Sequence, residues 1–304
     1  MRAPLKSTFS IVAVDRAAGE VGCAVQSRYF AVGSVVPWAR AGVGAVATQA
    51  AGVAAFGPRI LALLEEGLAP EVALEQVLAD DPGRESRQIG VVAADGRAAA
   101  HTGPECLAWA GHRVGDGYAV QGNILAGEAV AAEMERSFLE SDGSLAERLV
   151  SALEAGQAAG GDVRGQQSSA IVVERVGAAA ESREGIDRIC ELRVEDHPEP
   201  IAELRRLLGI HLIWDTLRRA SLFYAPGRHA EGVLMLRDAL ERHGEDAVLL
   251  YDLACFESLA GETGPALEHI ARALELDPKL RPGAAVESDF DALRQDPRFE
   301  ALFG

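Results

Sequence analysis

The stretch from Thr8 to Arg28, T-F-S-I-V-A-V-D-R-A-A-G-E-V-G-C-A-V-Q-S-R, decides how the chain begins to fold. Two runs rich in β-branched and apolar residues, 8–14 and 20–26, flank a short polar segment that ends in glycine. Such runs favour strands, and a polar, glycine-containing connection between them is typical of a tight turn. The stretch therefore predicts a β-hairpin.

The register of this hairpin would place a hydroxyl beside polar side chains. If Val14 pairs with about Val21, Thr8 lies opposite Gln26 and Ser27. Directly opposed side chains lie roughly 5 Å apart, which is close enough for them to act on one substrate. The arrangement would house an N-terminal threonine nucleophile, and an ordinary first hairpin explains the same pattern equally simply.

Composition limits the class of protein. The chain has 304 residues, of which 48% are hydrophobic and 25% charged, with a net charge of -17. These values are typical of a globular protein with room for two domains. The acidic excess argues against nucleic acid or an anionic membrane as the main partner.

Location and cofactors follow from what the sequence lacks. No segment approaches the about 18 continuous apolar residues that span a membrane, and the start, Met1–Ser7, is too short for a signal peptide. The four cysteines and seven histidines show no zinc-ligand spacing. We therefore expect a cytoplasmic protein without a metal or another cofactor.

Strands and helices are expected in groups along the first 210 residues. This grouping predicts an α+β domain over residues 1–210, in which sheets pack on each other and helices cover the outside. After the hairpin we expect strands at 31–36 and 42–49, helices at 56–67 and 70–79, strands at 88–93, 97–101, 107–110 and 118–121, helices at 127–140 and 145–155, and strands at 169–176 and 188–194.

Residues 211–304 predict a second, helical domain with an internal repeat. An offset of 34 residues aligns 213–246 with 247–280 and pairs Gly232 with Ala266. The period of 34 residues and the small residues that recur with it resemble the tetratricopeptide repeat. A generic helical bundle would show the same spacing of alanine and leucine. Such repeats bind a protein partner or a second copy of the chain, so we expect one of these partners.

The candidate catalytic residues are Thr8, Arg28 and Asn123. An N-terminal threonine can use its own α-amine as general base, because the usual pKa of that amine, about 7.7–8, leaves a sizeable neutral fraction. Arg28 would lower the pKa of the amine and stabilise an anion, unless it pairs with a surface carboxylate. Asn123 lies between a predicted strand and a predicted helix, where it would donate a hydrogen bond to an oxyanion.

Further candidates would bind the substrate. They lie at predicted strand ends or in the glycine-rich loop 160–168, and loops of this kind often carry function. For the loop residues, a flexible connector with an internal Asp–Arg pair is the alternative. The candidates are Gln26, Ser27, Thr48, Gln49, Gln121, Asp162 and Arg164.

Several motifs closely resemble an uncharacterised bacterial family, domain of unknown function 1028, over about residues 7–210. The resemblance implies membership of the N-terminal nucleophile (Ntn) hydrolase superfamily, and thus a four-layer αββα sandwich of two mostly antiparallel sheets. It implies no particular substrate. The motifs are T-F-S-I-V-A-V-D at Thr8, A-V-Q-S-R-Y-F-A-V-G-S-V-V-P-W-A at Ala24, G-V-G-A-V-A-T-Q-A at Gly42, T-G-P-E-C at Thr102, W-A-G-H at Trp109, V-Q-G-N-I-L at Val120 and G-G-D-V-R-G-Q-Q-S at Gly160.

Two functions of different classes are consistent with these residues. The first is an Ntn-type amidohydrolase acting on a small amide or peptide. Since seven residues precede Thr8, its amine would have to be freed by cleavage between Ser7 and Thr8. The second is a non-catalytic Ntn-fold protein that binds a small ligand and uses its helical repeats as a scaffold for a protein partner.

Overall fold

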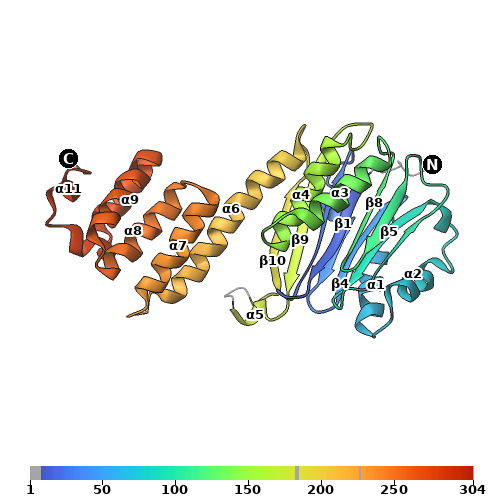
Figure 1. Cartoon of the computed structure of the whole chain (residues 1–304), viewed down its shortest axis with the longest axis horizontal. Helices are drawn as coiled ribbons and strands as arrows, with labels where there is room; N and C mark the ends of the chain where they lie inside the picture. The colour runs from blue at the N-terminus through green and yellow to red at the C-terminus, as the bar shows by residue number, and fades with distance from the viewer. Residues whose placement is uncertain (1–7, 182–184, 226, 304) are drawn as a thin grey trace. The chain divides into compact units, whose positions relative to one another are not determined.

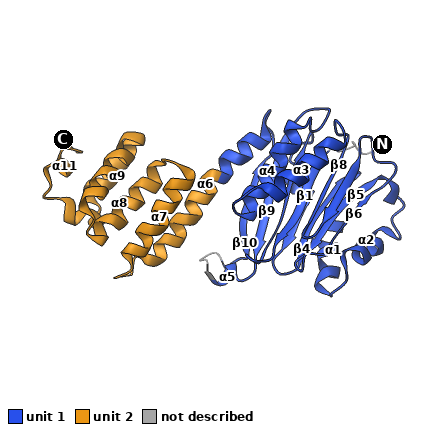
Figure 2. Cartoon of the chain, viewed as in Figure 1, with its two compact units in different colours: residues 1–208 blue, residues 209–304 orange. Residues whose placement is uncertain are grey.

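The structure is a computed structural model that describes residues 8–181, 185–225 and 227–303 (Figure 1). The chain divides into two compact units, residues 1–208 and 209–304 (Figure 2). The cleavage expected between Ser7 and Thr8, and the start of the chain before it, lie outside the described residues.

Unit 1 contains two antiparallel sheets. The larger sheet has the order β10-β9-β2-β1-β8-β7, and the smaller has the order β3-β4-β5-β6. The strands are β1 (Thr8–Asp15), β2 (Glu20–Ser27), β3 (Pro37–Arg40), β4 (Gly44–Ala50), β5 (Arg87–Ala93), β6 (Ala98–Thr102), β7 (Gly111–Gly115), β8 (Tyr118–Asn123), β9 (Ser168–Arg175) and β10 (Arg188–Val194).

Helices cover the outer faces of both sheets (Figure 1). On the smaller sheet, α1 (Phe56–Glu65) and α2 (Pro70–Leu78) form one apolar cluster with residues such as Val46 of β4. On the larger sheet lie α3 (Glu128–Glu140) and α4 (Leu145–Ala158). The α4 helix approaches β2 closely, because a Cβ atom at Gly22 would lie 2.9 Å from the Leu149 side chain. A short helix, α5 (Ala178–Glu181), precedes β10.

The inner faces of the two sheets form an apolar core. Val12 and Cys23 of the larger sheet pack with Ala45, Ala47 and Val92 of the smaller one. Burying each large side chain in such a core stabilises the fold by about 1.5–3 kcal/mol. Successive strand residues point to opposite faces, so every second residue of these strands reaches the core.

The hairpin register predicted from the sequence is confirmed, because Val14 pairs with Val21 and Thr8 with Ser27. The prediction of a strand at 31–36 is wrong. Ala31 has a left-handed φ of 55° and starts a 3-10 turn, so the chain leaves the extended conformation there.

The strand predicted at 107–110 is also absent from this part of the described chain. The carbonyls of Leu107 and Trp109 accept hydrogen bonds from Ile124 and Leu125, in the turn after β8. The backbone of 107–110 therefore pairs with a turn, and β7 starts only at Gly111.

Unit 2 is helical. It contains the later part of α6 (Pro200–Ala220), and then α7 (His229–His243), α8 (Ala247–Ala260), α9 (Thr263–Leu276), and the short α10 (Arg281–Val286) and α11 (Pro297–Glu300). Asp246 caps α8 by accepting hydrogen bonds from the amides of Val248 and Leu249. Among the described residues of both units, no helix combines the length and the apolar character needed to cross a bilayer.

Candidate functional site

Near the start of β1 and the ends of β2 and β8, the side chains that point between the two sheets are polar instead of apolar. Thr8 on β1 pairs with Ser27 on β2 and with Asn123 on β8. Directly paired residues share a face of a sheet, so all three side chains point between the two sheets. Thr8 and Ser27 are 0% exposed and their hydroxyl oxygens lie 3.1 Å apart. The structure thus brings together two of the three candidate catalytic residues, Thr8 and Asn123, with Ser27.

Gln49 of the smaller sheet holds the main chain of Thr8. Its Nε2 lies 3.3 Å from the Thr8 carbonyl oxygen, 3.3 Å from the Gln121 carbonyl oxygen and 2.9 Å from Gln88 Oε1. Its Oε1 accepts a 2.6 Å hydrogen bond from Ser10 Oγ. One side chain therefore ties β4 to both β1 and β8, which fixes the position of the Thr8 backbone across the gap between the sheets.

Gln88 does the same for Asn123. Its Oε1 accepts a 2.9 Å hydrogen bond from Asn123 Nδ2, and its Nε2 donates to the Gly122 carbonyl at 2.7 Å and to Thr102 Oγ1 at 3.0 Å. Thr102 Oγ1 in turn lies 2.9 Å from His112 Nδ1. Burial lowers the pKa of His112, and the neighbouring His101 acts in the same direction.

Gln121 completes the group of side chains between the sheets. Its Nε2 donates to Ser10 Oγ at 2.6 Å. The opposite strand leaves room for it, because a Cβ atom at Gly90 would lie 2.0 Å from Gln121 Oε1. Any larger residue in place of Gly90 would clash with the Gln121 side chain in its present position.

Ser10 and Gln88 also belong to this group, although neither was predicted as a site residue from the sequence. Both are 0% exposed, and both make hydrogen bonds within this group. The available signal was their place in the strands: each lies an even number of residues from an inward-facing core residue, Ser10 from Val12 and Gln88 from Val92.

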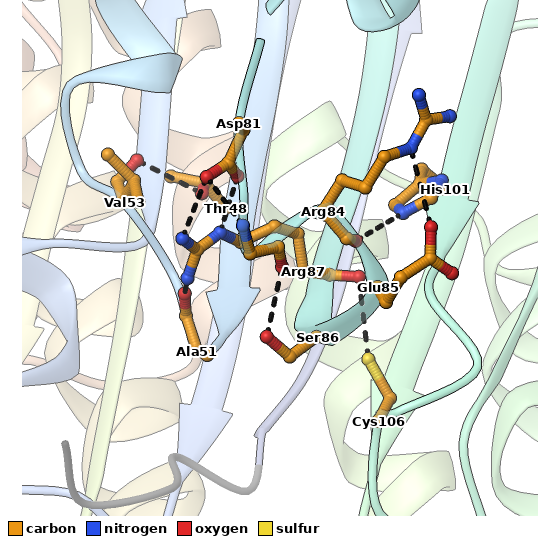
Figure 3. A network of polar contacts seen from close by, with 11 residues as sticks. Thr48, Ala51, Val53, Asp81, Arg84, Glu85, Ser86, Arg87, His101 and Cys106 are labelled. Carbon is orange, nitrogen blue, oxygen red and sulfur yellow. Dashed lines mark hydrogen bonds and ion pairs between the residues drawn. The ribbon is translucent and has the colours of Figure 1, made fainter. Parts of the chain in front are cut away.

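Two of the substrate-binding candidates, Gln26 and Thr48, do not face Thr8, and Gln26 is not the residue opposite Thr8 on β2. Each lies one residue from a residue that does point between the sheets, and strand alternation turns it to the opposite face. Gln26 pairs with Phe9, and Thr48 pairs with Ile89, which packs with α1 and α2. Thr48 Oγ1 donates to the Val53 carbonyl at 3.2 Å (Figure 3).

The loop candidates meet at the end of β2, one residue beyond Ser27. The carboxylate of Asp162 is buried and accepts a 3.2 Å hydrogen bond from the Arg28 amide. It also accepts a 2.8 Å hydrogen bond from the Arg164 amide, and the Arg164 guanidinium lies 3.3 Å away. Asp162 therefore ties its loop to the end of β2 and also forms the internal Asp–Arg pair. The side chain of Arg28 is exposed, and its Nη1 donates to the Gln166 carbonyl at 2.8 Å.

A partly buried ion pair supports the strand ends that carry Gln49 and Gln88. Arg87 Nε and Nη2 donate to the Asp81 carboxylate at 2.7 and 3.1 Å, and Arg87 Nη1 donates to the Ala51 carbonyl (Figure 3). The hydrogen bond from Arg87 lowers the pKa of Asp81. Because Ala51 follows β4 and Arg87 immediately precedes Gln88, the pair holds both segments in place.

Comparison with known proteins places this unit in a family. The model of a family of unknown function, DUF1028, matches residues 8–204. A crystal structure of protein SPO2555 from Silicibacter pomeroyi, assigned to the same family model, is 31% identical and has a TM-score of 0.61. The similarity covers 67% of this chain and 88% of that chain. A comparison with curated proteins finds no match.

Proposed function

The chain belongs to the family of unknown function DUF1028, and we propose that it is an Ntn-type amidohydrolase whose nucleophile is Thr8. In this proposal unit 1 is the four-layer αββα sandwich of Ntn hydrolases and unit 2 is a tetratricopeptide-like domain that docks a protein partner or a second copy of the chain. A small amide or short peptide is the substrate. The protein would act in the cytoplasm.

One observation carries the proposal. Thr8 begins an interior strand, and hydrogen-bonding side chains lie opposite it on both neighbouring strands, Ser27 on β2 and Asn123 on β8. A threonine nucleophile needs a hydroxyl held in one orientation and a donor close to the carbonyl that it attacks. Both requirements could be met by these neighbours.

The reaction would begin after cleavage between Ser7 and Thr8. The freed α-amine takes the proton of Thr8 Oγ1, and Oγ1 bonds to the carbonyl carbon of the substrate amide. Asn123 stabilises the oxyanion of the tetrahedral intermediate, and Ser27 keeps the Thr8 hydroxyl in position. The protonated amine then returns the proton to the leaving nitrogen as the C–N bond breaks. Water hydrolyses the resulting ester on Thr8.

A second candidate function is a non-catalytic protein that binds a small ligand in the same unit and a protein partner through its helices. One observation favours it: Thr8 has no exposed surface. A residue so enclosed suits a packed core position as well as a reactive one. In this case the chain would keep the peptide bond before Thr8.

The experiment that separates the two is the intact mass and N-terminal sequence of the purified protein, followed by a screen for amine release from small amides and dipeptides. A chain that starts at Thr8 and releases amine supports the hydrolase. A chain with residues before Thr8, no release, and a melting temperature raised by a metabolite supports the binding protein, since a ligand that binds only the folded state stabilises it by RT ln(1 + [L]/Kd).

A further inference from the structure

An open polar pocket of about 190 Å³ lies beyond the end of β2. Three segments that are distant in sequence meet there: the residue after β2, the end of the loop before β9, and the connection between β10 and α6. The lining residues are Arg28, Gln166, Gln167, Asp196, His197 and Pro198. A lining of charged and amide side chains is suited to a polar group rather than to an apolar one.

The pocket begins one residue beyond Ser27, the strand partner of Thr8. Ser27 contacts Thr8 through its hydroxyl, and its carbonyl accepts a 3.1 Å hydrogen bond from the Gln167 amide. Arg28 follows Ser27 in the chain. Cα atoms of directly paired strand residues lie at most about 5.5 Å apart and those of consecutive residues about 3.8 Å, so the Cα atoms of Thr8 and Arg28 are within about 9 Å. The pocket therefore lies within the length of a small molecule from Thr8, although Thr8 itself does not line it.

Arg28 offers a guanidinium that forms no ion pair with a described carboxylate. Its guanidinium donates from Nη1 to the Gln166 carbonyl at 2.8 Å, and no carboxylate of the described residues is within ion-pair distance of it. Most other arginines of unit 1, such as Arg87, pair with a carboxylate. The Arg28 amide donates to Asp162 and its guanidinium to the Gln166 carbonyl, so both ends of the residue are held. A guanidinium with unused donors is the usual protein group for binding carboxylates and phosphates.

His197 offers a second donor. The His197 amide donates to the Gln167 carbonyl at 2.8 Å, and Nδ1 accepts a 3.1 Å hydrogen bond from the Glu199 amide. Because Nδ1 is an acceptor, the neutral imidazole carries its hydrogen on Nε2. The one carboxylate in the lining, that of Asp196, is engaged by Gln167 Nε2 at 3.0 Å.

We propose that this pocket binds an anionic oxygen group, a carboxylate or a phosphate, of the molecule whose amide reacts at Thr8, with Arg28 as the main contact and His197 as the second. The inference rests on the proposed function for the identity of the reacting residue, but the binding itself needs no catalysis. It narrows the substrate class to small amides that carry a negative charge.

The test is a binding titration on the full chain. Binding is measured by calorimetry or by the NMR chemical shifts of the backbone amides of the pocket residues. The probes are N-acetylglycine, its uncharged analogue N-acetylglycinamide, and inorganic phosphate. We expect the two anions to bind at least 10-fold more tightly than the neutral amide, and added salt to weaken them. The stronger anion identifies the carboxylate or the phosphate as the group recognised. Equal binding of all three probes would overturn the proposal.

Variants locate the site. Arg28→Gln should weaken anion binding at least 10-fold, and Asp196→Asn should strengthen it by removing a like charge. Arg59→Gln is the matched control, because Arg59 lies exposed on α1 and also forms no ion pair with a described residue. Its binding should equal that of the natural sequence. If Arg28→Gln binds anions unchanged, or if Arg59→Gln weakens them as much, the pocket is not the site.

The same variants separate this inference from the proposed function. Thr8→Ala should bind the anions as tightly as the natural sequence does, because Thr8 does not line the pocket. If the natural sequence binds the anions but cleaves no amide, the hydrolase is refuted and the pocket assignment stands. Conversely, turnover of neutral and anionic amides at equal kcat/KM, unaffected by Arg28→Gln, would refute the pocket assignment and leave the hydrolase standing.

Discussion

Thr8 and Ser27 are paired residues of neighbouring strands, and their hydroxyl oxygens lie 3.1 Å apart with both side chains fully buried. The hydroxyl of Ser27 is therefore the nearest hydrogen-bonding group that the fold supplies to Thr8 Oγ1 from β2. In the proposed reaction only Thr8 forms a covalent bond to the substrate, whereas Ser27 orients the Thr8 hydroxyl. The loss of Thr8 should therefore lower the rate more than the loss of Ser27.

Replacing Thr8 should abolish amide hydrolysis, and replacing Ser27 should only slow it. Removal of a nucleophile costs more than about 10³-fold in rate. Removal of one orienting hydrogen bond is worth about 1–1.5 kcal/mol, which is roughly a 10-fold effect. The measurement is kcat/KM of Thr8→Ala and Ser27→Ala on any amide that the natural sequence cleaves.

The control for this comparison is Thr216→Ala, which removes a threonine hydroxyl in unit 2 that donates to the Leu212 carbonyl at 2.9 Å. It should leave the rate unchanged. Circular dichroism should show all three variants folded. A Thr8→Ala protein that is folded and fully active would exclude Thr8 as the nucleophile.

Two buried glutamines should respond oppositely to replacement by leucine. Gln88→Leu removes the buried hydrogen bonds that Gln88 makes to Asn123 Nδ2 and to the Gly122 carbonyl, and each such bond is worth about 0.5–1.5 kcal/mol. In Gln26 neither amide atom has a hydrogen-bond partner within the described chain, so Gln26→Leu removes an existing penalty. Urea unfolding should show a clear loss of stability for Gln88→Leu and none, or a gain, for Gln26→Leu. An equal loss in both would contradict this account.

The hairpin could be predicted from the sequence because its information is local. Alternating apolar residues and one glycine turn determine which residues pair, and Thr8 opposite Ser27 follows. Gln26 and Thr48 each lie one residue from an inward-facing neighbour, and a position near a strand end does not by itself tell which face a residue takes. Ser10 and Gln88 needed knowledge of the opposite sheet, since their partners lie 39 residues away in the sequence. A local sequence pattern does not predict a contact between residues that far apart in the sequence.

The ion pair of Arg87 and Asp81 should make stability depend on pH. Their side chains are 17% and 9% exposed. The pKa of Asp81 is lowered in the folded state, so the pair stabilises the fold above the unfolded pKa of about 3.9 and this contribution is lost as the pH falls through the lower folded pKa. Arg87→Met should cost about 1.5–3 kcal/mol at pH 7, because a partly buried carboxylate loses its charged hydrogen-bond partner.

The difference between Arg87→Met and the natural sequence should shrink below about pH 4, where the carboxylate of Asp81 takes up a proton in the variant. Urea unfolding at pH 7 and at pH 4 measures both values. Arg16→Met breaks the exposed pair with Asp116 and should change stability little at either pH. A difference for Arg87→Met that does not change with pH would mean that the ion pair is not its cause.

Two helical glycines of unit 2 should also respond oppositely to alanine. A Cβ atom at Gly232 would lie 2.4 Å from ring atoms of Phe256, which is 0% exposed and packs against Tyr224 at a ring distance of 4.4 Å. Overpacking costs about 1–3 kcal/mol and exceeds the gain in helix propensity of about 1 kcal/mol. Gly209 in α6 has no atom within 4 Å of the same position, so Gly209→Ala should gain that propensity in full. Urea unfolding and hydrogen exchange in α7 and α8 measure both effects. Equal stabilisation by both alanines would show that α7 and α8 can move apart, and that Gly232 is not required for their close packing.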